Sequence, residues 1–333
     1  MNQLSLEITT GGKVRQPLIV SCGMGVDSIA VLIGLWKRGI KPDLIIFADV
    51  GAEREKTYEY IAILNAWLRE VWGMEVVIVR YQAKNFKHWP PYHTIEENIL
   101  TNASLPAIAY GGHTCSAKWK IAPINAYVSE WKPAIECWRD GGKVRKAIGF
   151  EFSPHELRRS KRCGTFAIQD DEAEKYDFWF PLQEWKWNRA QCVAEIKSVG
   201  LPEPCKSSCY FCTAMKPHEV DGLSTTQLKN IVILEARANP RHIAYAEKRA
   251  AELGQEFDGK PLTEGLWRKR VKGMRGATAR PGSMTEYIRE RGLLPSSEVD
   301  RLKAATPGQP FTQADFLRLG FTNWQDWLKA IRQ

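Results

Sequence analysis

The chain has 333 residues, 44% of them hydrophobic and 26% charged, a composition that excludes a largely disordered, fibrous or low-complexity protein. At about 150 residues per domain, this length predicts two domains. The 47 Lys and Arg residues outnumber the 38 Asp and Glu residues, and the resulting net charge of +9 favours an anionic partner: nucleic acid, a nucleotide or a membrane surface. Eight cysteines are too few for a disulfide scaffold.

The N-terminal residues have neither the basic region nor the apolar stretch of a signal peptide. The longest apolar runs, such as residues 44–48, are far shorter than the roughly 20 residues needed to span a bilayer. We therefore expect a cytoplasmic protein without a membrane partner. In that compartment cysteines stay reduced and can bind metal.

The first half of the sequence alternates short apolar runs with amphipathic stretches. The expected strands are 17–21, 43–48, 75–80, 144–149 and 178–181, and the expected helices are 28–38, 55–70, 116–131 and 183–199. This alternation predicts βαβ units, and hence an α/β fold with a parallel, doubly wound sheet. The pattern is helical from about residue 224 onward. We therefore predict an α/β domain over residues 1–222 and a mainly helical domain over residues 223–333.

A glycine-rich turn follows the first expected strand, with the sequence Ser21-Cys-Gly-Met-Gly-Val-Asp-Ser28. Small residues let backbone N–H groups approach an anion, and the following helix N-terminus adds its positive dipole end. Ser21 and Ser28 can donate hydroxyls, and Asp27 can cap the helix. The turn matches neither the Walker pattern nor the dinucleotide fingerprint. The alternative interpretation is an ordinary tight turn before a capped helix.

A cysteine cluster lies in a proline-framed loop, with the sequence Cys205-Lys-Ser-Ser-Cys209-Tyr-Phe-Cys212. Three neighbouring thiols in a reducing compartment predict metal ligands, and the alternative is small buried side chains. Tetrahedral zinc and a [4Fe–4S] cluster both take four ligands. The candidates for the fourth are Cys22, Cys115, Cys137, Cys163, Cys192 and His218.

The turn and later segments resemble, in order, the motifs of the PP-loop ATP pyrophosphatase superfamily, and within it the phosphoadenosine phosphosulfate (PAPS) reductase-like family of phage, mobile-element or DndC-like type. The later segments are Phe47-Ala-Asp-Val-Gly-Ala-Glu53, Cys115-Ser-Ala-Lys-Trp-Lys-Ile-Ala-Pro-Ile124, Ile148-Gly-Phe-Glu151 with Arg158-Arg159, Phe180-Pro-Leu-Gln-Glu-Trp185 and Ser208-Cys-Tyr-Phe-Cys-Thr213. Together they cover about residues 17–220. Glu151 stands where the family has an arginine.

The resemblance implies an adenine nucleotide alpha hydrolase-like (HUP) fold, with an ATP or adenylyl-nucleotide site at the carboxyl ends of the strands. Asp27, Ser28 and Lys120 are then the predicted catalytic residues, with Mg²⁺ on the phosphates. Lys118 and Lys120 belong to the family's basic segment and would face the phosphates or the metal site, and the alternative is an exposed helix surface. The predicted nucleotide-binding residues are Ser21, Gly23, Gly25, Asp27, Ser28, Asp49, Gly51, Gly149 and either Arg158 or Arg159.

The resemblance also selects the fourth metal ligand. Cys115 falls where iron–sulfur members of the family carry the first residue of a cysteine pair, and Ser116 replaces the second. The predicted ligand set is Cys115, Cys205, Cys209 and Cys212. It favours a [4Fe–4S] cluster, with Zn²⁺ as the alternative.

The implied activity is hydrolysis of ATP to AMP and pyrophosphate, which adenylates a substrate during DNA or tRNA modification such as sulfur transfer. A sulfur-donor protein is a further candidate partner. The first alternative is a sulfonucleotide (PAPS/APS) reductase, but no cysteine follows Cys212, so Cys163 or Cys192 would have to replace that family's C-terminal nucleophile. The second is a nucleic-acid-binding protein that holds ATP without turnover.

A basic run in the predicted C-terminal domain is the candidate contact to nucleic acid. Six cations with glycine and threonine between them suit a phosphate backbone, and the alternative is a solvated helix face. These cations are Arg268, Lys269, Arg270, Lys272, Arg275 and Arg280.

Overall fold

The computed structural model describes residues 15–333, except for 84, 87, 107, 110, 111, 170, 171, 262, 268, 272–278, 307 and 309–312. The chain forms two compact units that interleave in sequence. Unit 1 comprises Met1–Ala48, Glu55–Val79 and Ile124–Ser207, and unit 2 comprises Asp49–Arg54, Arg80–Pro123 and Ser208–Gln333. The predicted boundary at residue 222 therefore lies inside unit 2, which also takes two segments from the first half of the chain.

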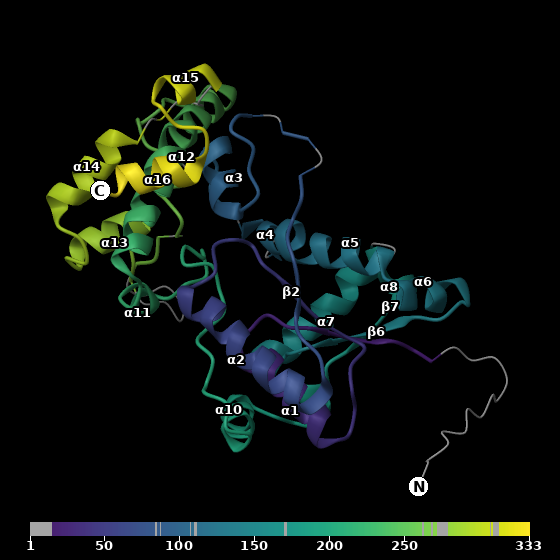
Figure 1. Ribbon diagram of the computed structural model, residues 1–333. Coiled ribbons are helices and arrows are strands. Elements are labelled where there is room, and N and C mark those ends of the chain that lie inside the picture. Colours follow the sequence, from purple (N-terminus) through teal and green to yellow (C-terminus); the bar gives the residue numbers. More distant parts are fainter. Residues whose placement is uncertain are drawn as a thin grey trace, which may run out of the picture. The chain divides into compact units, whose positions relative to one another are not determined.

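Unit 1 is built on a five-stranded sheet of order β3-β2-β1-β6-β7 (Figure 1). Every strand pair in it is parallel, which confirms the predicted α/β class and parallel sheet. The strands are β1 (Leu18–Ser21), β2 (Leu44–Ala48), β3 (Val77–Val79), β6 (Val144–Ile148) and β7 (Tyr176–Trp179). From β1 the chain proceeds to β2 on one side, whereas β6 pairs with β1 on the other. The order thus reverses between β1 and β6, where such folds bind ligands.

Helices cover both faces of this sheet, because successive strand residues point to opposite sides. Val20, Phe47 and Ala147 belong to an apolar cluster with α1 (Val26–Lys37), α2 (Glu55–Trp72) and α10 (Arg189–Ser198). Ile19 and Ile46 belong to the opposite cluster, with α5 (Ala122–Glu130) and α6 (Lys132–Arg139). The arrangement is consistent with the predicted doubly wound fold.

The remaining elements of the first two thirds include one unexpected long helix, α7 (Pro154–Gln169). The helix expected over 116–131 is split into α4 (Thr114–Ser116), the π-helical η1 (Ala117–Ile121) and α5. The other elements are α3 (Ile95–Asn102), α8 (Glu172–Lys175), α9 (Pro181–Glu184) and the antiparallel pair β4 (Ile108–Ala109) and β5 (Gly112–His113).

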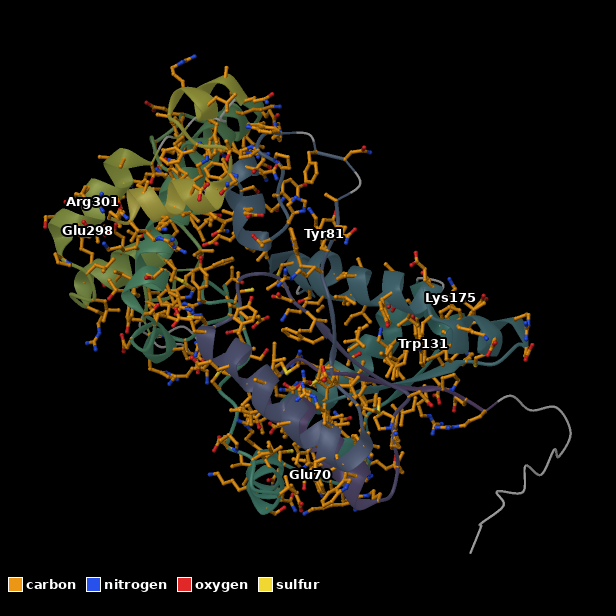
Figure 2. All side chains as sticks on the ribbon, viewed as in Figure 1. Glu70, Tyr81, Trp131, Lys175, Glu298 and Arg301 are labelled. Atoms are coloured by element: carbon orange, nitrogen blue, oxygen red, sulfur yellow. The ribbon has the colours of Figure 1, made fainter. Side chains whose placement is uncertain are left out.

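In unit 2, helices of the C-terminal region pack with α3 around one apolar cluster. They are α11 (Pro217–Val220), α12 (Thr225–Glu252), α13 (Met284–Glu290), α14 (Ser296–Ala305), α15 (Gln313–Arg318) and α16 (Trp324–Ile331). Phe316, Trp324 and Trp327 are buried in this cluster. Glu298 and Arg301 form an ion pair on α14 (Figure 2). None of the helices in the described segments is long and apolar enough to cross a membrane.

Candidate functional site

The glycine-rich turn joins β1 to α1 at the point where the strand order reverses. Its start is fixed to β2 by a hydrogen bond of 2.9 Å from the Cys22 amide to the Ile46 carbonyl oxygen. Gly25 is the N-cap of α1 and provides no side-chain cap. The Ser28 hydroxyl donates to the Gly25 carbonyl oxygen at 3.0 Å. The expected cap by Asp27 is absent from this described turn, so the N–H groups at the start of α1 lack a side-chain acceptor.

Ser21 lies at the carboxyl end of β1. Its Oγ is buried and has no hydrogen-bond partner among the described residues. A buried hydroxyl without a partner costs free energy, so a ligand acceptor would stabilise it. Beside it, a Cβ added at Gly23 would meet no atom within 4 Å. The turn therefore combines open space with unused donors.

Gly149 follows β6 and touches the same turn. A Cβ added there would lie 2.7 Å from the carbonyl carbon of Asp27 and 2.8 Å from the amide nitrogen of Ser28. Because both neighbours are backbone atoms, only glycine fits at this position. The structure thus brings Gly149 together with the predicted phosphate loop.

Asp27 forms an ion pair with Arg189 of α10, whose Nη1 lies 2.9 Å from the aspartate Oδ1. Burial raises the pKa of Asp27, as does nearby Glu151, and Arg189 opposes both effects. Glu151 Oε2 is itself buried without a partner in the described part of the chain. Sequence analysis did not identify Arg189, because it belongs to no recognisable motif.

The two candidate arginines of α7 differ in their contacts. Arg159 donates from Nη1 to Glu156 Oε1 at 2.9 Å and Oε2 at 2.8 Å, and its guanidinium carbon lies 4.8 Å from the Phe150 ring centroid. Arg158 is exposed, and no ion pair of Arg158 is found among the described residues. Arg158 is therefore the more available of the two predicted phosphate ligands.

Asp49 and Gly51 belong to unit 2. Arg80 donates to Asp49 Oδ2 through Nε at 2.9 Å and Nη2 at 2.7 Å, and the Gly51 amide donates to Asp49 Oδ1 at 2.8 Å. Gly51 has a φ of 72°, and a Cβ there would lie 2.2 Å from Thr94 Cγ2. The Asp49 carboxylate thus accepts hydrogen bonds that hold its own loop, and its predicted role in nucleotide binding stays a prediction.

Lys120, also in unit 2, lies 2.9 Å from Oε1 of Glu53, whose side chain is fully buried. Burial lowers the pKa of Lys120, but the charge and hydrogen bond of Glu53, together with the neighbouring Cys209 and Cys212, raise it by more. Lys120 therefore remains a cation beside the cysteines. Glu53 also forms a backbone bridge to Cys209, so the loop after β2 holds the cysteine loop.

Three of the predicted metal ligands are neighbours in unit 2. Burial raises the pKa of Cys115 and Cys209, and each is raised further by the charge of Cys212. Cys205 belongs to unit 1, where its Sγ lies 3.5 Å from Thr57 Oγ1. Among the described residues, no three or more His, Cys, Asp or Glu side chains are arranged to hold a metal ion. The predicted four-cysteine ligand set therefore stays a prediction, with Cys115, Cys209 and Cys212 near enough to influence one another's pKa.

The basic run is described only at Lys269, Arg270 and Arg280; Arg268, Lys272 and Arg275 lie outside the described residues. Arg270 and Arg280 exchange two backbone hydrogen bonds of 3.0 Å. The Arg280 side chain donates to the Met215 carbonyl oxygen at 3.0 Å and lies 4.8 Å from the Trp267 ring centroid. Arg280 therefore stabilises unit 2, and the contact of the run with nucleic acid stays a prediction.

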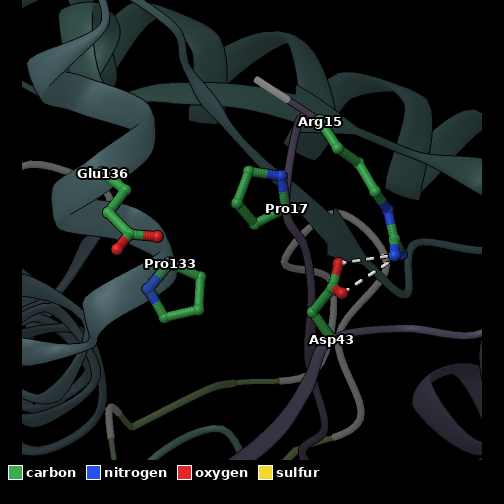
Figure 3. A pocket seen from close by; sticks show the side chains of 5 residues that line it. All are labelled: Arg15, Pro17, Asp43, Pro133 and Glu136. Carbon is green, nitrogen blue, oxygen red and sulfur yellow. Dashed lines mark hydrogen bonds and ion pairs between the residues drawn. The ribbon is translucent and has the colours of Figure 1, made fainter. Parts of the chain in front are cut away.

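Unit 1 contains a cavity of about 180 Å³, whose lining residues are drawn in Figure 3. It is lined by Arg15, Pro17, Asp43, Pro133 and Glu136. Arg15 lies 3.1 Å from Asp43 Oδ1. Since Pro17 and Asp43 precede β1 and β2, this cavity is at the amino ends of the strands. Ligands of open α/β sheets bind at the other end, so we assign it no role.

No protein-family model matches the chain, and no curated protein matches it significantly. Inference about function therefore depends on the residues and geometry described above.

Proposed function

We propose that the chain is a PP-loop ATP pyrophosphatase of HUP-type fold with a mainly helical C-terminal domain. It hydrolyses ATP to AMP and pyrophosphate and adenylates a substrate during DNA or tRNA modification, such as sulfur transfer. One observation carries the proposal: an uncapped helix N-terminus and the buried, unpartnered Ser21 hydroxyl lie where the strand order reverses. This combination suits a phosphate chain.

The chemistry requires a substrate oxygen to attack the α-phosphorus. The bond from that phosphorus to the bridging oxygen breaks, and pyrophosphate leaves. Amides at the start of α1 stabilise the charge on the leaving group, helped by the hydroxyls of Ser21 and Ser28 and by Arg158. Mg²⁺, when bound, screens the phosphates. Asp27 is the oxygen ligand available to it at the turn, in exchange for its ion pair with Arg189.

Loss of the Asp27 carboxylate is expected to lower pyrophosphate release at least about 100-fold. The assay supplies α-labelled ATP with single-stranded DNA or tRNA and separates AMP, ADP and pyrophosphate. Asp27→Ala is compared with Asp140→Ala, which removes an acid at the end of α6, paired only with its neighbour Arg139 among the contacts described. Formation of ADP in place of AMP would contradict the proposal. Binding of ATP and nucleic acid without turnover would favour a non-catalytic protein.

A metal centre belongs to the proposal because three of its predicted ligands, Cys115, Cys209 and Cys212, are near enough in unit 2 to influence one another's pKa. Cys115, Cys209 and Cys212 would bind it, with Cys205 as the fourth ligand expected from the sequence, and the Lys120 cation would offset the thiolate charge. A [4Fe–4S] cluster, when bound, supplies sulfur or structural stability. Zn²⁺ is the alternative and would supply stability alone.

Anaerobic purification is expected to yield a brown protein with about four iron atoms per chain. Cys209→Ala should lose the iron and the visible absorbance, because it removes a central ligand. Cys137→Ala, which removes a buried thiol of α6, should retain both. A colourless protein with one zinc ion would show that the centre is a Zn²⁺ site and not a cluster. Absence of any metal would contradict both kinds of centre.

One observation disfavours a sulfonucleotide reductase. Cys192 is fully buried, and burial, aided by Asp27 and Glu151, raises its pKa to about 12. Such a thiol is a poor nucleophile, because the thiolate is the reactive form. The side chain of Cys163, the other candidate nucleophile, lies outside the described part of the structure. Release of sulfite from PAPS with a dithiol donor would support the reductase instead.

A further inference from the structure

The ammonium group of Lys118 lies among aromatic rings of unit 2. Its ammonium nitrogen lies 5.0 Å from the ring centroid of Tyr81 and 5.2 Å from those of Tyr92 and Trp119. Tyr81 and Trp119 are themselves 4.8 Å apart, and Tyr81 is labelled in Figure 2. Distances below about 6 Å are those of cation–π contacts. Three rings from two chain segments thus surround one cation.

The ring cluster extends to the surface through Phe86. This ring stands nearly perpendicular to Tyr92 at 5.2 Å and to His93 at 5.7 Å, and its side chain is 37% exposed. Trp119 is buried at 3% exposure and forms the floor. We call Tyr81, Phe86, Tyr92, Trp119 and Lys118 the aromatic platform.

The segment that carries the platform is basic. Residues 80–94 read Arg-Tyr-Gln-Ala-Lys-Asn-Phe-Lys-His-Trp-Pro-Pro-Tyr-His-Thr and contain three Lys or Arg and no Asp or Glu. Lys84 and Lys87 lie outside the described residues. Aromatic rings interleaved with cations are the composition of surfaces that bind single-stranded nucleic acid.

A cluster of several aromatic rings can bind either a quaternary ammonium group or the base of a nucleotide. The presence of Lys118 among the rings distinguishes between these two kinds of ligand. An empty cage of rings would suit a quaternary ammonium ligand. Here the chain's own ammonium occupies that position and would repel a second cation. The cluster therefore suits a ligand that has both a flat aromatic face and a negative charge, and a nucleotide has both. Bases in a duplex are already stacked, so only a single strand presents a free face.

We infer that the aromatic platform stacks a base of single-stranded nucleic acid, with Lys118 beside the adjoining phosphate. The choice of nucleic acid as partner rests on the proposed function, and the platform adds where the acceptor strand is held. Phe86 supplies the accessible ring, and Tyr81, Tyr92 and Trp119 fix Lys118 behind it.

The test measures fluorescence anisotropy of a labelled single strand of about 15 nucleotides and of its duplex, without ATP. Phe86→Ala is expected to weaken single-strand binding about 5- to 100-fold and to leave duplex binding unchanged. Phe86→Tyr should restore it. Lys118→Gln should reduce the slope of log affinity against log salt by about 0.7, the loss of one phosphate contact. Tyr245→Ala, at a 58% exposed aromatic side chain on α12, should bind as the wild type.

Absence of single-strand binding by the wild type, or equal binding by wild type and Phe86→Ala, would overturn the inference. So would a variant that loses ATP affinity alone, because the platform would then belong to the nucleotide site. Pyrophosphate release is measured on the same proteins. Phe86-dependent strand binding without ATP turnover would contradict the proposed activity and support the inference about the aromatic platform. ATP turnover without strand binding would support the proposed activity and contradict that inference.

Discussion

Gly149→Ala is expected to lower pyrophosphate release at least about 100-fold, because displacement of a catalytic loop by about 1 Å has effects of this size. The new Cβ would lie 2.7 Å from the carbonyl carbon of Asp27 and 2.8 Å from the amide nitrogen of Ser28. Backbone atoms in a turn between β1 and α1 cannot yield as a flexible side chain can. The turn must therefore move away from β6, taking Asp27 and Ser28 with it.

Two further glycine variants distinguish an effect on ATP binding from an effect on the stability of the fold. Gly23→Ala places its Cβ in open space, so it should unfold at the wild-type temperature yet bind ATP more weakly, because that space is the proposed phosphate site. Gly222→Ala, whose Cβ would meet only the Glu219 carbonyl oxygen at 3.9 Å, should change neither property. Turnover is measured by pyrophosphate release and stability by thermal unfolding. Wild-type turnover by Gly149→Ala would contradict the assignment of this turn.

Glu235→Gln is expected to reduce the free energy of unfolding by about 2–4 kcal/mol. Glu235 is buried on α12, and its two carboxylate oxygens accept four hydrogen bonds. The donors are the amides of Leu266 at 2.6 Å, Met284 at 2.9 Å and Thr285 at 2.8 Å, and the hydroxyl of Ser283 at 2.5 Å. A glutamine would turn an NH₂ group toward some of these donors, leaving them unsatisfied and removing the negative charge at the start of α13.

The measurement is urea unfolding monitored by tryptophan fluorescence. Glu247→Gln makes the same chemical change at an exposed position of the same helix and should leave the midpoint unchanged. Equal stability of Glu235→Gln and the wild type would show that the four hydrogen bonds contribute little. If both variants were less stable than the wild type, the loss of stability would come from removing a negative charge from α12 and not from the hydrogen bonds of the buried Glu235 carboxylate.

The sheet could be predicted from sequence because its central strands are buried on both faces. Residues 18–20 and 44–48 form continuous apolar runs, which are recognisable without tertiary information. The turn after β1 was equally visible through its small residues. Strand β7 begins at Tyr176, earlier than expected, because an edge strand carries a weaker apolar pattern. Helix α7 was missed since its sequence is mostly polar and contains a glycine.

The contacts that organise the candidate site were not predictable. Arg189 meets Asp27 across a separation of 162 residues, and Arg80 meets Asp49 across 31. No local spacing specifies such pairs, which form only when the fold brings the segments together. The same limit applies to Lys118: the family resemblance placed it in a basic segment, whereas its surroundings are rings supplied by residues 81 and 92.

The interleaving of the two units has a consequence for synthesis on the ribosome. Helix α3 lies in the first third of the chain, but its apolar residues Ile99 and Leu100 are buried in the same cluster as α12 and α16. During translation from the N-terminus these residues have no core to join until the last helices emerge. All residues of unit 1 have been made once synthesis reaches residue 207, whereas residues 80–123 of unit 2 have no complete core until the last helices are made. A transcript truncated after residue 222 would therefore yield a protein with exposed apolar surface, a substrate for chaperones and proteases.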